Sequence, residues 1–416
     1  MKTFKVRRVC ITVIAASAIV SLCGGAAAQA MDYGPNKSLA SAIKMEAADA
    51  LPRTALYDTP KSLSATKPGT LLRQEAFDGY DIPEGARAVR ILYHSTDGEG
   101  HDVATSAAIL IPAGASPARG WPVIAWAHGT SGVARQCAPS LMKDVYYGEE
   151  LMVMVRAGYA VVATDYSGLG TAGAHRYMDR YAQANDVIFS IPAARTAVPE
   201  LGRGWVADGH STGGRAVWGV AEIEGKRHDA GYLGSVAVAP GVDLRMMSLL
   251  HMAEPVPAGY YFDYLAYAIH RKTPSFQVSD MLTKQSMARF YDVTTKGCYS
   301  YTAHYPGDLE PSKKLKPGWE KTEAAERLFR VNEPGKVSLG GPMFIVAGDQ
   351  DHTIQLVAVR DAVSKACRRG GALNFRIYPG LDHGPTMEKS IPDQLSWIAD
   401  RFAGKAVKGE CGTPGN

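Results

Sequence analysis

Short apolar runs recur along most of the chain, and helix-like stretches separate them. Two runs, Pro122–Ala127 and Tyr159–Ala163, are apolar almost without interruption, which is typical of parallel strands buried on both faces. Further strand-like runs lie at Val206, Ser235–Val238, Met343–Ala347 and Asn374–Tyr378. Helical patterns at Met142–Ala157 and Asn185–Val198 lie between strands. This alternation predicts an α/β fold in which a mostly parallel sheet carries helices on both faces.

The first two strand-like runs are connected differently from the others. Only the hairpin-like segment Asp97–Gly100 separates Ala88–Tyr93 from Val103–Ile111. A connection this short can join antiparallel strands, whereas parallel strands need a long crossover. The sequence therefore predicts an antiparallel start to the sheet.

The alternation stops between residues 242 and 341. This segment is rich in Met, Leu and Tyr at first and in Lys later. We interpret it as a mainly helical cap or lid inserted into a core made of residues 86–241 and 342–411. Its aromatic residues, such as Tyr261 and Tyr264, either line a substrate pocket or form the cap's own core. Residues 31–85 show little periodicity and are expected to form an arm that wraps the core.

Residues 1–30 have the features of a secretory signal peptide. Basic residues precede the apolar run Val9–Leu22, and Ala28–Ala30 forms an A-x-A cleavage site. An uncleaved membrane anchor is the alternative, because the next small residues extend the apolar run towards spanning length. A lipoprotein signal at Cys23 is disfavoured by the leucine before it. We expect a secreted or periplasmic protein with no stable membrane insertion after cleavage.

The positive net charge of the chain belongs to this amino-terminal segment. The whole sequence has 45 Lys and Arg against 41 Asp and Glu, and residues 1–30 hold four basic residues and no acidic ones. The remaining chain is neutral. Nucleic acid is therefore not expected as a partner, because it attracts a clustered excess of Lys and Arg.

Four cysteines follow the predicted cleavage site: Cys137, Cys298, Cys367 and Cys411. An even number in an exported chain predicts two disulfides, and the wide spacing excludes the close C-x-x-C pairs of zinc or redox sites. Three pairings are possible. We prefer Cys367 with Cys411, which ties the tail to the preceding helix, and Cys137 with Cys298.

The segment from Gly209 to Gly214 reads G-H-S-T-G-G and lies between a strand-like and a helix-like run. A serine hydroxyl becomes a useful nucleophile on a tight strand-to-helix turn, where small neighbours let the backbone bend and leave the oxygen accessible. Gly209 and Gly213 supply these neighbours. Ser211 is therefore the predicted nucleophile, and an ordinary Gly-rich turn is the alternative interpretation.

A nucleophilic serine needs a base and an acid that orients the base. Asp351 follows the strand-like run at Met343–Ala347 and is the predicted acid, with Asp349 as its rival. His383 is expected on the loop between the last strand-like run and a final helix, so the chain order is serine, acid, histidine, as in α/β-hydrolases. His352 is expected to be a loop residue beside the acid, and Asp382 to be structural or exposed.

The oxyanion of a tetrahedral intermediate needs two donors. One is expected to be the backbone N–H of Thr212, directly after the nucleophile. The second is expected in the loop after the strand at Pro122–Ala127, where Thr130 is preferred and Gly129 is next. His128 is expected to support this loop rather than to transfer a proton.

Three segments together resemble the secretory lipase family of α/β-hydrolases, which includes yeast lipase A-type enzymes and bacterial exported relatives. They are the Trp121–Thr130 segment, the Gly158–Thr171 segment with its D-Y-S-G-L-G element, and the G-H-S-T-G-G turn. Cys137–Ser140 fits the same pattern. The resemblance covers about residues 55–411.

The resemblance implies carboxylic ester hydrolysis by Ser211, Asp351 and His383, without a metal or another cofactor, on a small-molecule or lipid ester. It also implies a lid between core strands and a late disulfide. Thr212 and Gln355 depart from the residues common at their positions, which leaves details of the pocket open. Aromatic plant esters, lactones or peptides are alternative substrates, and a non-catalytic binding protein on the same scaffold is the alternative function.

Asp165 and Tyr166 follow the buried run at Tyr159–Ala163. Their position suits loop shaping, and this structural role is the preferred interpretation for both residues. Tyr166 is in addition a candidate for lining the acyl pocket.

Overall fold

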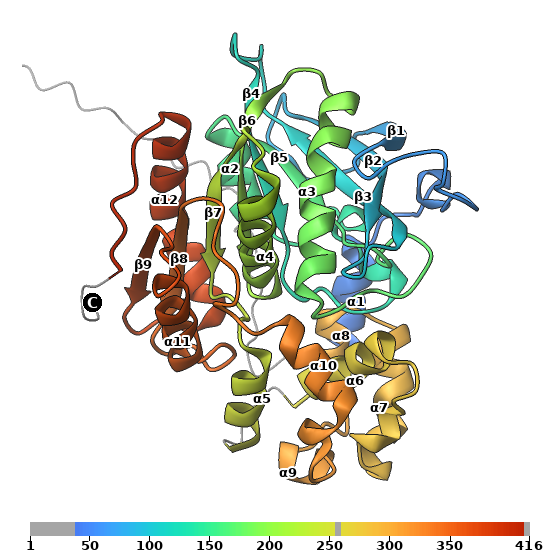
Figure 1. The fold of residues 1–416 in the computed structure, drawn as a ribbon. Helices are drawn as coiled ribbons and strands as arrows, with labels where there is room; N and C mark the ends of the chain where they lie inside the picture. The colour runs from blue at the N-terminus through green and yellow to red at the C-terminus, as the bar shows by residue number, and fades with distance from the viewer. Residues whose placement is uncertain (1–37, 254–258, 412–416) are drawn as a thin grey trace, which may run out of the picture.

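A nine-stranded sheet forms the centre of the molecule (Figure 1). The computed structural model describes residues 38–253 and 259–411. Its strand order is β1-β2-β3-β5-β4-β6-β7-β8-β9, with antiparallel pairing from β1 through β3 to β5 and parallel pairing across the rest of the sheet. The predicted antiparallel start and mostly parallel sheet are both confirmed. The strands are β1 (Leu71–Phe77), β2 (Arg87–Thr96), β3 (Asp102–Ile111), β4 (Trp121–Ala127), β5 (Ala160–Thr164), β6 (Leu201–His210), β7 (Tyr232–Val238), β8 (Met343–Gly348) and β9 (Leu373–Tyr378).

Helices cover both faces of the sheet. On one face, α3 (Arg180–Ala197), α4 (Thr212–Arg227) and α11 (Leu356–Cys367) share a hydrophobic core with the strands. On the other face, α2 (Glu149–Arg156) and α12 (His383–Phe402) do the same. Because β4 and β5 are covered from both sides, nearly every residue in them is buried. This burial explains why their sequences are apolar almost without interruption.

The helix expected at Met142–Ala157 is shorter than its sequence pattern, and α2 begins only at Glu149. Before it, Val145 and Tyr146 have φ angles of 54° and 70°. An α-helix cannot contain such residues, because its φ angles lie near −63°. The segment is instead a turn, and it places the hydroxyl of Tyr147 within 3.0 Å of the backbone nitrogen in the loop that follows β4.

The described part of the predicted arm contributes a strand to the sheet. β1 pairs antiparallel with β2 at the sheet edge, and polar residues fill its middle, so no apolar alternation marked it in the sequence. Helix α1 (Leu39–Asp49) reaches the cap, where the Glu46 carboxylate accepts the backbone N–H groups of Cys298 and Tyr301 at 2.9 and 2.7 Å. The predicted signal peptide lies outside the described residues.

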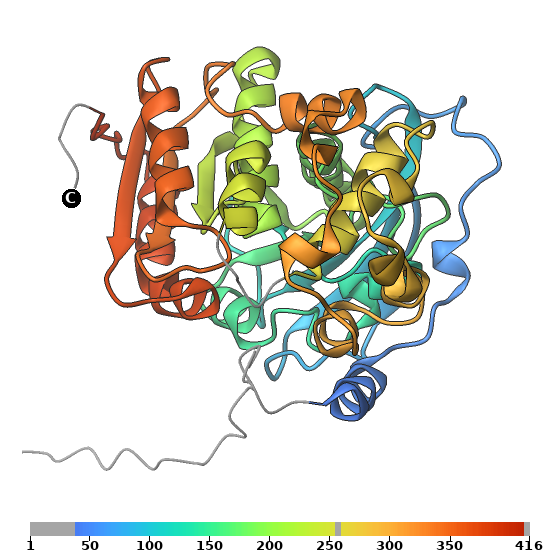
Figure 2. The same ribbon diagram turned by 90° about the horizontal axis from the view of Figure 1, so that it is seen from below.

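The segment between β7 and β8 folds into helices that gather at one end of the sheet (Figures 1 and 2). They pack around a hydrophobic core of their own, in which Tyr264 and Trp319 are almost fully buried. Most of the aromatic residues that the sequence placed in this segment therefore hold the cap together. The helices are α5 (Leu244–Ala253), α6 (Tyr261–Lys272), α7 (Lys284–Thr295), α8 (Tyr299–His304), α9 (Pro311–Lys314) and α10 (Glu323–Val331).

Two disulfides join the cysteines in the preferred pairing. Cys137 pairs with Cys298 across 161 residues, and Cys367 pairs with Cys411 across 44. Cys137 lies in a core loop, whereas Cys298 caps α8. The first disulfide therefore ties the cap to the core, and the second ties the tail to α11.

Candidate active site

Ser211 occupies a strained turn between β6 and α4. Its φ and ψ angles are 60° and −119°, a region that costs a non-glycine residue about 1–3 kcal/mol. The backbone holds this conformation, because Ser211 N–H donates to the Val238 carbonyl at 2.9 Å and the Ser211 carbonyl accepts from Gly241 N–H at 3.0 Å. Gly213 is required for close packing, since a Cβ there would lie 1.8 Å from the Ala127 oxygen. The geometry is that of a nucleophile elbow.

Asp351 and His383 meet at the carboxyl end of the sheet. Asp351 follows β8, and its side chain is 1% exposed. Its Oδ1 accepts the backbone N–H groups of Thr353 and Ile354 at 2.8 and 2.7 Å, and its Oδ2 lies 2.7 Å from Nδ1 of His383. Two backbone donors thus fix the carboxylate, which in turn orients the imidazole. This arrangement suits a base whose Nε2 takes a proton from a hydroxyl.

The neighbouring acidic residue has a different partner. Asp349 is exposed, and its carboxylate accepts the backbone N–H of Gly380 at 2.6 Å. His352 is exposed as well, and its backbone N–H donates to Asp382 at 3.1 Å. Of the two rival acids, the structure brings Asp351 to the histidine.

His383 is the first residue of α12 rather than part of a loop before it. Asp382 is the residue that caps this helix, and its carboxylate accepts the His383 backbone N–H at 2.7 Å. Because a capping side chain satisfies a helix N–H that has no intrahelical partner, the helix can begin directly at the histidine. His383 is therefore held by a helix end as well as by Asp351.

The ring of His383 packs against the residue that precedes the serine. The His210 and His383 ring centroids are 4.5 Å apart, with an interplanar angle of 36°. Burial, followed by the nearby His383 charge, lowers the pKa of His210 well below its usual range. His210 is therefore neutral near pH 7, and its contact brings the Asp351–His383 pair beside the elbow.

The loop after β4 lies against the elbow, since a Cβ on Gly129 would be 3.3 Å from Cβ of Ser211. The Gly129 N–H already donates to the Tyr147 hydroxyl at 3.0 Å. The Gly129 carbonyl lies 2.6 Å from Nδ1 of His128. In a trans peptide the carbonyl and the following N–H point in opposite directions, so the Thr130 N–H points away from His128. Between the two donors considered from sequence, the geometry favours Thr130.

His128 supports the loop from a buried position. Burial lowers its pKa to about 4, so the ring is neutral near pH 7. Its two nitrogens face the carbonyls of Gly129 at 2.6 Å and Asp165 at 3.1 Å. A neutral ring can donate to only one of them, and the shorter distance assigns the proton to Nδ1.

The other candidate donor, Thr212, is the first residue of α4. The first N–H groups of a helix have no intrahelical partner, and the helix end carries partial positive charge. An oxyanion that develops beside Ser211 would be stabilised by the Thr212 N–H and by the partial positive charge of this helix end.

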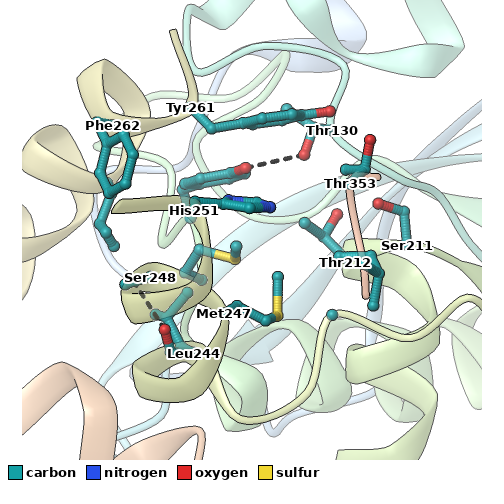
Figure 3. A pocket seen from close by; sticks show the side chains of 15 residues that line it. Thr130, Ser211, Thr212, Leu244, Met247, Ser248, His251, Tyr261, Phe262 and Thr353 are labelled. Carbon is teal, nitrogen blue, oxygen red and sulfur yellow. Dashed lines mark hydrogen bonds between the residues drawn. The ribbon is translucent and has the colours of Figure 1, made fainter. Parts of the chain in front are cut away.

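A narrow apolar slot leads from Ser211 into the cap (Figure 3). Its cavity volume is about 40 Å³, and Thr130 and Thr212 line it beside the serine. Tyr261, one of the predicted substrate contacts, also lines the slot. Its other lining residues come from both the core and the cap: Tyr177, Met178, Gly241, Leu244, Met247, Ser248, His251, Phe262, Leu265, Thr353 and Ile354.

Two tyrosines expected to contact substrate are not among the residues that line the slot. Tyr166 is 1% exposed, and its hydroxyl donates to the His128 carbonyl at 3.0 Å. Tyr264 is fully buried in the cap core. Asp165 is fully buried, and it accepts the backbone N–H of Ser140 at 2.7 Å. Each of these three side chains therefore helps to hold a loop or the cap, and none of them lines the slot.

Sequence reasoning missed the side chains that support the site from behind. Tyr147 contacts the Gly129 amide and His210, and the Tyr177 hydroxyl lies 2.9 Å from the Thr130 hydroxyl. His210 was visible only as the variable residue of the elbow pentapeptide. No spacing rule connects these positions, because loops that are distant in sequence bring them together.

One acidic group in the described part of the chain has the spacing of metal ligands. Ligand atoms of Asp97, Glu99 and His101 lie within 4.8 Å of one another. Arg176 already pairs with Asp97 at 2.8 Å and Lys272 with Glu99 at 3.1 Å. These cations neutralise the group, and none of its residues lines the slot.

Comparison with known proteins points to one family. A family model described as Secretory lipase matches residues 145–409. A protein named probable inactive lipase, from Mycobacterium tuberculosis (strain CDC 1551 / Oshkosh), is 26% identical over 383 residues, which cover 84% of this chain and 82% of the relative.

Solved structures of lipases and esterases share the fold. Candida antarctica lipase A in its closed state superimposes with a TM-score of 0.76 and 18% identity, over 88% of this chain and 90% of that one. The rice cell wall degrading esterase LipA from Xanthomonas oryzae, in a ligand-bound form, has a TM-score of 0.67 and 17% identity, over 81% of this chain and 97% of that one. At these identities the likeness concerns the architecture.

Proposed function

The chain belongs to the secretory lipase family, and on this premise we propose that it is an exported serine hydrolase that cleaves carboxylic esters. The main support is the 2.7 Å contact between His383 and Asp351, made where the His383 ring packs beside the elbow that carries Ser211. A binding protein would have no need of a fixed acid–histidine pair next to a strained serine. The chemistry we infer is acyl transfer through Ser211.

In the first half of the proposed reaction, Ser211 Oγ attacks the ester carbonyl and gives its proton to Nε2 of His383. The N–H groups of Thr130 and Thr212 stabilise the oxyanion. His383 then donates the proton to the leaving alkoxide, and an acyl-enzyme remains. Water next attacks this ester with His383 as the base, and the collapse of the second intermediate releases the acid and restores the serine.

The name of the Mycobacterium relative raises the alternative that this chain has the fold of a lipase without its activity. That protein is called probable inactive, and it is 26% identical to the chain over 383 residues. Here the serine, the aspartate and the histidine all occur in hydrolase order, at Ser211, Asp351 and His383. Their presence supports an active enzyme.

We further propose that the protein is secreted or periplasmic. The signal-peptide pattern of residues 1–30, the two disulfides and the family support this location. Among the described residues, no helix combines the length and the apolar character needed to cross a membrane.

Ester hydrolysis with and without the serine tests the proposal. Purified wild type and Ser211→Ala are compared on p-nitrophenyl esters from acetate to palmitate and on an aromatic hydroxycinnamate ester. Wild type should turn over at least one ester, and the variant should lose about 10⁴-fold or more in kcat. Equal turnover by both proteins would rule out Ser211 as the nucleophile.

Covalent labelling separates an enzyme from a binding protein on the same scaffold. An alkyl fluorophosphonate should label Ser211 in the wild type, as located by peptide mass spectrometry, and the Ser211→Ala protein serves as the unlabelled control. If the wild type hydrolyses no ester and takes up no label, the binding-protein interpretation replaces ours.

A further inference from the structure

His210 links two parts of the candidate site that come from different loops. It is the last residue of β6, directly before Ser211, and it is 2% exposed. On one side its Nδ1 lies 2.9 Å from the Tyr147 hydroxyl, and on the other its ring packs against the ring of His383. One buried side chain thus contacts both the loop before α2 and the start of α12.

The Tyr147 hydroxyl connects two buried groups. The Gly129 N–H can only donate, so the Tyr147 oxygen accepts it at 3.0 Å. The same hydroxyl lies 2.9 Å from Nδ1 of His210, and the His210 tautomer sets which of the two groups donates. The hydroxyl therefore joins His210 to the Gly129 amide in either tautomer.

This chain of bonds ends in the loop that carries the candidate oxyanion donor. Gly129 directly precedes Thr130, and Tyr147 holds the Gly129 amide from behind. The Tyr147 ring is itself fixed by edge contacts with Trp126, at a centroid distance of 4.8 Å, and with His210, at 5.9 Å. The position of the loop relative to the elbow therefore depends on the bond between Tyr147 and His210.

The other face of His210 restrains the candidate base. At 4.5 Å between centroids and 36° between planes, the two imidazoles make a tilted contact over their faces. The carboxylate of Asp351 fixes only Nδ1 of His383, and a single bond leaves the ring free to tilt about it. The contact with His210 restricts this tilt, and so sets where Nε2 points.

We propose that His210 is a positioning residue. Its ring contact fixes the base His383 relative to Ser211, and its hydrogen bond to Tyr147 fixes the loop at Gly129 and Thr130 relative to Ser211. This inference rests on the proposed esterase function. Displacing a reacting group by about 1 Å can cost about 10²-fold in rate, so the link matters although His210 touches no substrate.

Three variants separate the two contacts of His210. His210→Phe keeps a ring beside His383 but removes the hydrogen-bond partner of Tyr147. His210→Asn keeps a hydrogen-bonding group near the place of Nδ1 but removes the ring. Tyr147→Phe removes only the hydroxyl. Each should lower kcat on p-nitrophenyl acetate by about 10- to 100-fold, with KM within about twofold of wild type because the slot is intact.

A matched control removes a hydrogen-bonded tyrosine hydroxyl elsewhere in the core. The Tyr232 hydroxyl lies 2.6 Å from Ser235 Oγ in β7, and neither residue lines the slot. Tyr232→Phe should change kcat by less than about twofold at a similar loss of thermal stability. If it lowers kcat as much as Tyr147→Phe does, general destabilisation explains the effect and the proposal is wrong.

The double variant Tyr147→Phe/His210→Phe tests whether the two side chains act together. Because both single changes break the same bond, the double variant should lose much less in kcat than the product of the two single losses. Fully multiplicative losses would overturn the linkage.

Magnetic resonance tests the positioning without any turnover. The Gly129 amide should exchange with solvent faster in Tyr147→Phe and His210→Phe than in wild type, and remain protected in His210→Asn. The resonance of the His383 Nδ1 proton should move in His210→Asn and stay in place in Tyr147→Phe. Unchanged Gly129 exchange would overturn the proposal. A wild type that hydrolyses no ester but gives these responses would contradict only the proposed function.

Discussion

The carboxyl end of the sheet and the cap next to it are held in place by different interactions. In the core, backbone hydrogen bonds fix the turn at Ser211 and two backbone N–H groups hold Asp351. In the cap, buried aromatic side chains and ion pairs organise the helices, as where Lys314 binds Asp263 at 2.8 Å with both side chains fully buried. The core therefore positions chemical groups through its backbone, whereas the cap depends on the choice of side chains.

The difference shows how one fold can keep its chemistry while its substrate changes. Backbone contacts tolerate many side chains, so the elbow and the acid turn depend on few residues. The slot, by contrast, receives Leu244, Met247 and Leu265 from cap helices, and their size limits what fits beside Ser211. We expect substitutions at the carboxyl end of the sheet to change the rate, and substitutions in the cap to change the choice of ester.

The largest expected effect separates the two aspartates after β8. Asp351→Asn should lower kcat by about 10⁴-fold, because an amide cannot hold the His383 tautomer that the reaction needs. Asp349→Asn should stay within about twofold, because this side chain only accepts a loop N–H. Steady-state kinetics on p-nitrophenyl acetate measure both, and similar losses in the two variants would contradict the assignment.

Disulfide removal tests how firmly the cap is attached. By loop-closure entropy, replacing Cys137 and Cys298 with alanine should cost about 5 kcal/mol of unfolding free energy, against about 4 kcal/mol for Cys367 and Cys411. Urea unfolding of the two double variants under matched oxidising conditions compares them. A larger loss for the tail disulfide would show that the cap contributes little to global stability.

A substitution that enlarges the slot should change the preferred acyl-chain length of the ester. Leu265→Ala enlarges the slot, so the ratio of kcat/KM for the octanoate ester to that for the acetate ester should rise about tenfold. Ile269→Ala is the matched control, because this residue is fully buried on the same helix but does not line the slot. If both variants shift the ratio equally, the slot does not select the acyl chain.

Acid should destabilise the core through its buried histidines. Burial lowers the pKa of His175 to about 3, whereas an unfolded histidine titrates near 6.5. Below about pH 6.5 the unfolded state binds a proton that the folded state does not bind. The free energy of unfolding therefore decreases as the pH is lowered. Relative to His175→Gln, the wild type should lose about 1 kcal/mol between pH 7 and 5.5 in urea unfolding. No change in that difference would contradict the buried neutral ring.

The cap should respond with the opposite sign. Burial raises the pKa of Asp263 to about 6 despite the opposing Lys314 charge. Its folded state therefore favours the protonated acid, and the contribution of this group to stability is lost as the pH rises from about 4 through 6. Relative to Asp263→Asn, the wild type should become less stable over this range. A rise instead would mean that the ion pair outweighs burial.

Strand positions were readable from sequence, because each strand needs one apolar run and one turn. Helix α2, which precedes β5, was predicted too long from the sequence. Leu151 to Val155 continue an apolar pattern that begins at Met142, while the backbone turns at Val145 and Tyr146. β1 was missed because an edge strand needs little apolar surface. Cap residues such as Tyr264 could not be assigned to slot or core, because both environments select aromatic side chains.

By itself, the sequence determined which residues stand at strand ends in hydrolase order, since the elbow, the acid turn and the last histidine each follow a local pattern. Only the tertiary structure distinguishes neighbours: it brings Asp351 rather than Asp349 to His383, and it engages the Gly129 N–H with Tyr147. It also revealed the contact of His210 with His383. Choices of this kind depend on which atoms of distant loops lie within hydrogen-bond distance, and no local pattern of residues encodes that distance.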